Sequence, residues 1–394
     1  ALPNGTKGIG ERMFYGCSSL AEVTIPESVE TIGADAFNGC ASLQKIEIPA
    51  GVKELAARTF LDCSSLQSIS LPKGLTKIEW QVFRGCASLG EIVLPDGIAE
   101  LGWSAFFGCS SLKEIDLPDS VTAIDHGVFQ NCTSLSHVRL SAGLTAIPAR
   151  AFSGCTSLES LEIPEGVTEI GHDAFWDCSA MTRLTLPDAC TDIGVNAFSG
   201  CSSLEFLSMP ELCQKLANYF GGNAEDIPET LTALKIRGGD QIVSGSLEGC
   251  SSLVSLTLPS LKIGDYLGRY FGATNTSQNG EYVPKSLKEL TVLGAGTAGI
   301  GSVGLAACKG CGSLEKVTLG EGIEILSGSS FEECTSLREI ILPDSLTKIY
   351  TFVFYNCTAL ETIDLPDGVT TIGGYAFSGC SSLAELEFPA ELTT

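Results

Sequence analysis

Short runs of alternating hydrophobic and polar residues recur along the chain and are separated by turns. In one of these runs, Ile46 and Ile48 alternate with charged residues, which predicts a short β-strand with one buried face. A proline follows the run, and it ends the strand because proline cannot donate a hydrogen bond to a β-ladder. The pattern therefore predicts many short strands, each closed by a turn.

A second group of hydrophobic residues follows each turn. Val29 and Ile32 are predicted to return to the core, Gly33 allows a bend, and a short helical turn over residues 34–38 is predicted to bury Phe37. The complete unit reads LxxIxLPxxVxxIGxxAFxxCxSL. No unit can bury its hydrophobic face alone, but units stacked at the strand spacing of about 4.8 Å would form continuous buried ladders.

A cysteine stands at the same position of each regular unit, and the regular units are 23 residues long. A fixed period of this length indicates a solenoid. The regularly spaced cysteines are Cys17, Cys40, Cys63, Cys86, Cys109, Cys132, Cys155, Cys178 and Cys201, followed by Cys311, Cys334, Cys357 and Cys380.

This unit resembles the BspA-type, or Treponema-type, leucine-rich repeat of bacterial surface proteins, because its proline, phenylalanine, cysteine and leucine columns coincide from Pro3 to Leu392. The resemblance implies an α/β repeat fold: a right-handed leucine-rich-repeat solenoid of 23-residue coils with a parallel concave β-sheet and short helical turns. It also implies export or surface attachment, and binding to host proteins or neighbouring cells.

The repeat indicates one solenoid domain over residues 1–394, with regular coils in 1–210 and 311–394 and irregular coils in 211–310. The irregular region contains two paired insertions, which read LANYFG from Leu216 and LGRYFG from Leu267. Each insertion is expected to form a short helix and a loop. A leucine precedes each of the expected irregular strands, and these leucines are spaced by 27, 22, 34 and 27 residues. They are Leu204, Leu231, Leu253, Leu287 and Leu314. The polar residues 273–282 are expected to protrude, either for recognition or as a tolerated insertion.

The charge of the chain excludes two classes of partner. With 47 acidic and 23 basic residues, the formal net charge is −24, so we expect the chain to repel nucleic acid and anionic membranes. No apolar run approaches the ~18 residues of a membrane span. We expect a monomer that acts outside the cell or at the bacterial cell surface, with its export signal outside this sequence.

All 17 cysteines are predicted to be free and buried. Cys250 joins the regular column, Cys190 and Cys213 occupy the column of Val29, and Cys308 occupies the column of Phe37. A disulfide framework is the usual alternative in an exported chain. A run of parallel cysteines has no reason to pair off, however, so the alternative is not favoured.

No residues combine into a catalytic site, so the chain is not expected to be an enzyme or to hold a cofactor. The GxGxxG motif at residues 294–299 is followed by a repeat coil and not by the helix of a dinucleotide site. The CxxC motif ending at Cys311 occupies two core columns, and the histidines His126, His137 and His172 do not cluster. Acidic residues that follow the prolines are explained by calcium binding or by turn preference: Glu165, Asp188, Glu211, Glu321, Asp344 and Asp367.

Aromatic side chains in variable columns are the candidate binding residues. Trp80, Trp103 and His126 occupy one column of consecutive coils, and Phe107 and Trp176 occupy another. A second group contains Tyr350, Phe352, Tyr355 and Tyr375. These rings are explained either as a binding patch for protein or glycan or as half-buried packing.

The leading hypothesis is a non-enzymatic protein that binds host or neighbouring-cell proteins or glycans, including extracellular matrix, in adhesion or recognition. The alternative is a structural spacer or stalk for a domain outside this sequence.

Overall fold

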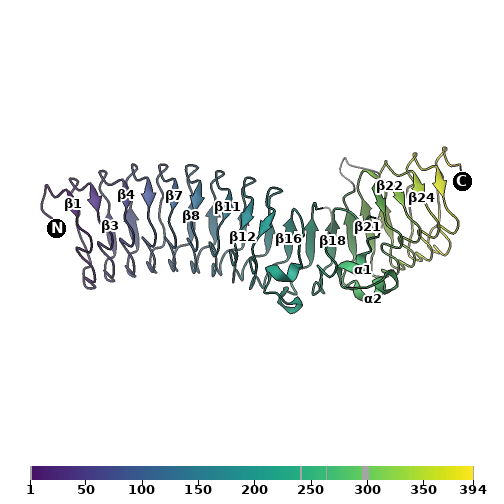
Figure 1. Ribbon diagram of the computed structural model, residues 1–394, viewed down its shortest axis with the longest axis horizontal. Helices are drawn as coiled ribbons and strands as arrows, with labels where there is room; N and C mark the ends of the chain where they lie inside the picture. Colours follow the sequence, from purple (N-terminus) through teal and green to yellow (C-terminus); the bar gives the residue numbers. More distant parts are fainter. Residues whose placement is uncertain (1, 240–241, 263, 295–300, 394) are drawn as a thin grey trace. The chain divides into compact units, whose positions relative to one another are not determined.

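A computed structural model describes residues 2–239, 242–262, 264–294 and 301–393. Contacts divide the chain into two compact units. The first comprises Ala1–Leu204 and Tyr219–Gly222, and the second comprises Glu205–Asn218 and Asn223–Thr394. Within each unit the coils stack in chain order, so that equivalent strands lie side by side (Figure 1). The parallel solenoid with coils of 23 residues is confirmed by registers such as that of Ile46 with Ile69.

Coils of the first unit contribute strands of three residues that follow the predicted alternation, with the middle side chain buried and its neighbours facing outward. They pair in parallel as β3 with β5, β8 with β10, and β12 with β14. These strands are β3 (Lys45–Glu47), β5 (Ser68–Ser70), β8 (Glu114–Asp116), β10 (His137–Arg139), β12 (Ser160–Glu162) and β14 (Arg183–Thr185).

A second set of strands, each two residues long, was not predicted. It forms where the hydrophobic residues after the proline turn return to the core, and it pairs as β1-β2, β4-β6-β7-β9 and β11-β13-β15. These strands are β1 (Gly8–Ile9), β2 (Thr31–Ile32), β4 (Glu54–Leu55), β6 (Lys77–Ile78), β7 (Glu100–Leu101), β9 (Ala123–Ile124), β11 (Ala146–Ile147), β13 (Glu169–Ile170) and β15 (Asp192–Ile193).

The segment over residues 34–38 is a series of turns and not the helical turn that the sequence predicted. Asp35 has a φ of 58°, outside the right-handed helical region. The N–H groups alternate between two coils: that of Phe37 donates to Thr59 in the next coil (2.9 Å), whereas that of Asn38 donates to Asp35 in its own coil (3.1 Å). Because a helix directs these groups within its own segment, the alternation replaces a helix with a ladder of turns.

A ladder of stacked phenylalanines fills the core of the first unit. From Phe14 to Phe198, rings of consecutive coils stack with centroids between 5.1 and 6.2 Å apart. The cysteine column lies beside this ladder, and the thiol of Cys63 donates to the carbonyl oxygen of Phe37 in the preceding coil (3.1 Å). Cysteine therefore supplies both a small apolar side chain and a weak hydrogen-bond donor.

The second unit contains two parallel sheets. The first joins β16 (Phe206–Met209), β17 (Ala233–Ile236), β18 (Ser255–Leu258), β19 (Glu289–Val292), β21 (Lys316–Leu319) and β23 (Glu339–Ile341) in that order. The second joins β20 (Gly301–Val303), β22 (Ile323–Leu326), β24 (Lys348–Ile349) and β25 (Thr371–Ile372). The predicted steps of the irregular strands are confirmed, because the structure pairs Leu207 with Leu234, Leu234 with Leu256, Leu256 with Leu290, and Leu290 with Val317.

The two paired insertions form short helices, as expected. They are η1 (Leu216–Tyr219), a 3-10 helix, and α1 (Leu267–Tyr270), an α-helix. Two further 3-10 helices, η2 (Ala224–Asp226) and η3 (Thr276–Gln278), and one α-helix, α2 (Asn279–Tyr282), follow them. The polar residues 273–282 are therefore ordered into η3 and α2. Asn279 anchors them, because its buried side chain accepts from the N–H of Gly268 (2.8 Å) and donates to the carbonyl of Ala306 (3.1 Å).

Candidate binding surfaces

The first unit carries an aromatic surface at the turns that follow β6, β7 and β9. The rings of Trp80 and Trp103 stack with centroids 6.2 Å apart and an angle of 28° between their planes. Gly102 permits this spacing, since a Cβ there would lie 2.6 Å from the backbone nitrogen of Trp80. His126 follows in the next coil with 66% of its side chain exposed, and its Nδ1 lies 2.7 Å from a carboxylate oxygen of Asp125. The column therefore presents a stacked pair of tryptophans, with the exposed His126 one coil further along.

An ion pair supports one end of this column. The guanidinium carbon of Arg58 lies over the Trp80 ring, 4.5 Å from its centroid. The same guanidinium donates to both carboxylate oxygens of Asp35, at 2.8 and 2.7 Å. Asp35 is buried, and Asn38 also donates to its carboxylate (2.7 Å). These hydrogen bonds, chiefly those from Arg58, lower the pKa of Asp35.

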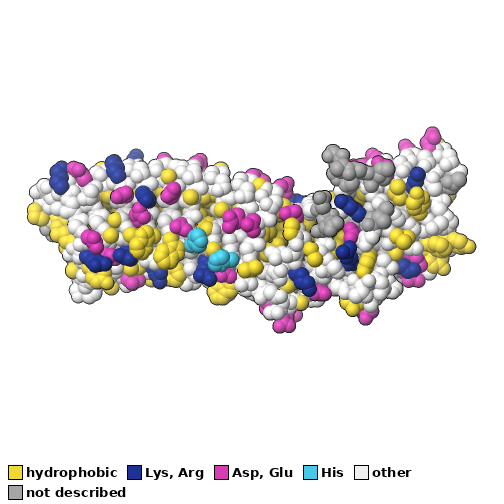
Figure 2. Space-filling model, viewed as in Figure 1, with side chains coloured by type: hydrophobic (Ala, Val, Ile, Leu, Met, Phe, Trp, Pro, Cys, Tyr) yellow, Lys and Arg dark blue, Asp and Glu magenta, His cyan; other side chains and the backbone are white. Residues whose placement is uncertain are grey.

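A second arginine stacks beside the column. The guanidinium carbon of Arg84 lies over the Phe107 ring at 4.5 Å from its centroid. We call Arg58, Trp80, Arg84, Trp103, Phe107 and His126 the tryptophan edge. Arg58, Arg84 and Asp35 were not among the predicted binding residues. For Asp35 and Arg58 the available signal was a pair of opposite charges one period apart in the same column. Figure 2 shows hydrophobic, basic and histidine side chains close together on this face of the first unit.

Trp176 does not join the tryptophan edge, although it shares a column with Phe107. It lies three coils further along the repeat, and its side chain is exposed. The neighbouring His172 instead contacts Asp173, which also pairs with Arg150 (3.2 Å).

The second unit carries a separate group of aromatic rings, Tyr350, Phe352, Tyr355 and Tyr375, which we call the tyrosine group. Phe352 and Tyr375 stack with parallel planes and centroids 5.0 Å apart. Tyr355 meets the edge of Phe352 at 5.5 Å and 78°. Both Phe352 and Tyr375 have left-handed backbone, with φ values of 61° and 60°. Tyr350 is exposed but forms no ring contact with the described residues.

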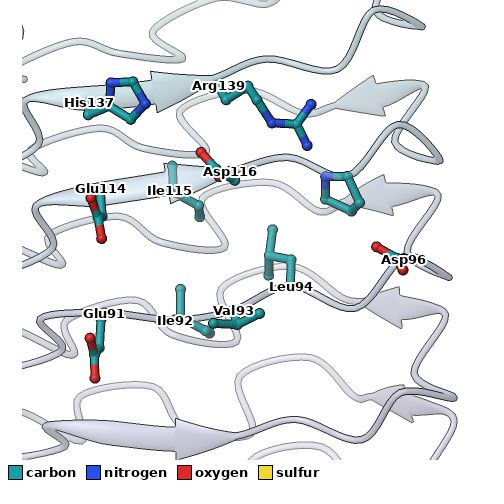
Figure 3. Close-up of a pocket in the computed structure, with 11 residues that line it drawn as sticks. Glu91, Ile92, Val93, Leu94, Asp96, Glu114, Ile115, Asp116, His137 and Arg139 are labelled. Carbon is teal, nitrogen blue, oxygen red and sulfur yellow. The ribbon is translucent and has the colours of Figure 1, made fainter.

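A pocket of about 390 Å³ opens on the sheet face of the first unit (Figure 3). It lies where residues 91–94 form no strand between β5 and β8. Val93 is 84% exposed there, with Glu91, Glu114 and Asp116 around it. Figure 3 shows His137, Glu114 and Glu91 in one column. The sequence analysis missed this pocket, and its signal was a valine at an outward position of the alternating pattern.

The remaining sequence motifs lie partly in the core and partly outside the residues that the structure describes. Cys308 and Cys311 are buried, which agrees with the core interpretation of the CxxC motif. Most of the GxGxxG motif, residues 295–299, lies outside the described residues. Among the described residues, no three His, Cys, Asp or Glu side chains could hold a metal ion. In the acidic column, the N–H of Asp344 donates to the carboxylate of Glu321 in the preceding coil (3.2 Å).

The cysteines are free, as expected, but they are not all buried. Cys17 and Cys213 are exposed and Cys380 is partly exposed. The prediction for Cys213 was wrong because Leu212 takes the buried position after Pro210. Burial raises the pKa of the Cys40 thiol to about 11. Within the described part of the chain, the longest helices are too short to cross a membrane.

Solved structures of three bacterial leucine-rich repeat proteins are among those similar to this chain. A crystal structure of a leucine-rich repeat protein from Bacteroides ovatus is 28% identical over 90% of this chain and 81% of that chain, with a TM-score of 0.47. The T. pallidum leucine rich repeat protein is 28% identical over 50% of this chain and 82% of that chain, with a TM-score of 0.38. A leucine rich cell surface protein from Faecalibacterium prausnitzii is 26% identical over 59% of this chain and 70% of that chain, with a TM-score of 0.35.

No curated protein matches this chain significantly. By contrast, the family model for the BspA type leucine rich repeat region matches residues 1–113, 99–226 and 301–394, which together make up most of the sequence. The chain therefore belongs to the BspA-type leucine-rich repeat family.

Proposed function

We propose that this protein is a non-enzymatic binding protein, secreted or held at the bacterial cell surface, that uses its solenoid surface for adhesion or recognition. Membership of a family built on leucine-rich repeats supports a binding scaffold. The partners that we propose are proteins or glycans, including host extracellular matrix.

The observation that carries this proposal is the tryptophan stack. The core of the first unit is already filled by the phenylalanine ladder, so Trp80 and Trp103 are not needed to close it. Trp103 remains 46% exposed, although burying a ring of this size is strongly favourable. Exposed aromatic clusters mark interaction sites, and tryptophan is enriched among the residues that contribute most to binding.

Binding of the purified chain to a panel of extracellular-matrix proteins and glycans would test the proposal. A double variant with Trp80→Ala and Trp103→Ala should lose binding, whereas Val195→Ala should retain it. Val195 is a suitable control because it is an exposed apolar residue in the same column of the repeat. Binding that is unchanged in the tryptophan variant would contradict a role for the stack.

A structural spacer is the second candidate. It is favoured by the unbroken phenylalanine ladder of the first unit, which would make a stiff rod segment. A spacer should bind no member of the panel, so the same experiment separates the two functions.

A further inference from the structure

We propose that the tryptophan edge docks an acidic segment of a partner protein, with Asp35 as the residue that positions it. This inference rests on the proposed binding function and adds the chemistry of the partner. Three observations support it: the coverage of the Trp80 and Trp103 rings, the positive charge of Arg84 beside them, and the ion pair between Asp35 and Arg58 behind them.

Both faces of the Trp80 ring are covered, and Trp103 and Phe107 each have one face covered. Arg58 lies over Trp80 from the preceding coil, and Trp103 stacks on Trp80 from the following coil. Arg84 covers a face of Phe107 in the same way. The edge of an aromatic ring is electropositive, and the indole nitrogen is a hydrogen-bond donor. At Trp80, a ligand that stacks on a ring face, such as a neutral sugar, is therefore disfavoured relative to one that brings negative charge to the ring edge.

Arg84 supplies an available positive charge at this position. Its guanidinium forms no ion pair with any described residue, and Asp62 in the preceding coil does not approach it within salt-bridge distance. Arg58 and Arg150, in the same unit, are each paired with a carboxylate. The planar guanidinium group matches a carboxylate with two parallel hydrogen bonds. Arg84 is thus the cation that a carboxylate from a partner would meet.

The net charge of −24 does not prevent this contact. At physiological salt, exposed charges more than about 8 Å apart are largely screened, so recognition at the edge depends on the local groups. The local groups are ring edges, an indole donor, the Arg84 guanidinium and the Asp125 carboxylate, which lies against Nδ1 of His126. Trp and Arg are also the residue types that dominate binding energy between proteins, which is why we commit to a protein segment and not to a glycan.

The edge is held in place before a partner arrives. Asp35 is 1% exposed and is fixed by two hydrogen bonds from Arg58 and one from Asn38. Arg58 in turn fixes the face of Trp80, against which Trp103 stacks. A surface that is already ordered loses less conformational entropy on binding. Asp35 contacts no partner in this scheme and acts only through Arg58.

The test uses fluorescent peptides of about 12 residues and measures anisotropy at 150 mM salt. One peptide alternates Glu with Leu and Trp, a matched peptide replaces each Glu by Gln, and an oligouronate provides a carboxylate-bearing glycan. We expect the Glu peptide to bind about tenfold more tightly than the Gln peptide, and Arg84→Gln to remove that difference. Arg150→Gln, in the same unit but outside the edge, should bind as the wild type does.

The role of Asp35 has its own readout. Asp35→Asn should weaken peptide binding several-fold and reduce the near-ultraviolet circular dichroism of the stacked tryptophans, whereas far-ultraviolet spectra stay unchanged. Asp35→Glu, which keeps the charge, should restore part of both signals. Unchanged tryptophan dichroism in Asp35→Asn would overturn the positioning role even if that variant is less stable.

Failure of this proposal is distinct from failure of the proposed function. Equal binding of the Glu and Gln peptides, or binding of the oligouronate without the peptide, overturns docking of an acidic protein segment. The proposed function would still stand if the matrix panel detected a partner. If the panel detects none and the peptides do not bind, both proposals fail.

Discussion

The tryptophan edge and the tyrosine group are built at neighbouring positions of the same repeat, but they are supported in different ways. Trp80 and Trp103 stand two residues after the buried residue of the second strand, where φ is not left-handed. Phe352 and Tyr375 stand one residue later, where φ is about +60°. The first stack is supported by a buried ion pair, and the second by direct contact between its rings.

This difference shows how one repeat can display aromatic rings from two neighbouring positions with different backbone conformations. A left-handed conformation costs a non-glycine residue about 1–2 kcal/mol. In the first unit the same position holds Asp35, Asn196 and other polar residues. In the tyrosine group the rings themselves stand on left-handed residues, whereas in the tryptophan edge the left-handed residues are Asp35 and Arg58, the ion pair behind the rings.

The largest expected loss of stability comes from substitutions in the phenylalanine core that lies under both surfaces. Phe83→Ala and Phe354→Ala should each lower the free energy of unfolding by about 3–5 kcal/mol, because each removes a buried ring from the ladder and leaves a cavity. Denaturant unfolding would measure both. Phe107→Ala, at a partly exposed ring, is the control and should cost much less. A similar loss for Phe107→Ala would mean that the edge is part of the core.

The ion pair predicts a loss of stability that is specific to the tryptophan edge. Asp35→Asn should lower the free energy of unfolding by about 2 kcal/mol, since it weakens two charged hydrogen bonds. Hydrogen bonding from Arg58 lowers the pKa of Asp35 below its ordinary value of about 3.9. The stabilisation should be complete above that value and be lost as the pH falls through the lowered pKa.

Acid titration of stability provides the check. The wild type and Phe352→Ala should lose the Asp35 contribution below about pH 4, whereas Asp35→Asn should not. Identical pH profiles for the wild type and Asp35→Asn would show that the ion pair does not stabilise the edge.

The difference in φ predicts that glycine is the more stable substitution at position 375, whereas alanine is the more stable substitution at position 103. At position 375, Tyr375→Gly should be about 1 kcal/mol more stable than Tyr375→Ala, because glycine adopts positive φ without strain. At position 103, Trp103→Ala should be more stable than Trp103→Gly by about 0.4–1 kcal/mol, because alanine restricts the unfolded chain. Thermal unfolding of the four variants would measure both differences. The same order at both positions would remove the distinction between the two surfaces.

The sequence predicted the features that repeat and missed those that depend on single pairs. Period and alternation were sufficient for the strands that precede the proline turns, for the phenylalanine ladder and for the irregular steps around Leu234 and Leu290, because burial repeats in every coil. The helical turn at 34–38 was wrong because left-handed residues such as Asp35 are not distinguished by hydrophobic pattern. The ion pair between Asp35 and Arg58 was missed because neither residue belongs to the consensus.

The smallest expected loss of stability comes from replacing Arg84, and it distinguishes this arginine from Arg58, the other arginine of the tryptophan edge. Arg84→Gln should lower the free energy of unfolding by only about 0.5 kcal/mol, the value of an exposed cation–π contact. Arg58→Gln should cost several times more, because it leaves the buried carboxylate of Asp35 with Asn38 and the more distant Arg12, at 3.4 Å. Denaturant unfolding of both variants at neutral pH would measure this difference. Equal losses would show that Arg58 is no more an anchor than Arg84, and that the stack is held by its rings, as the tyrosine group is.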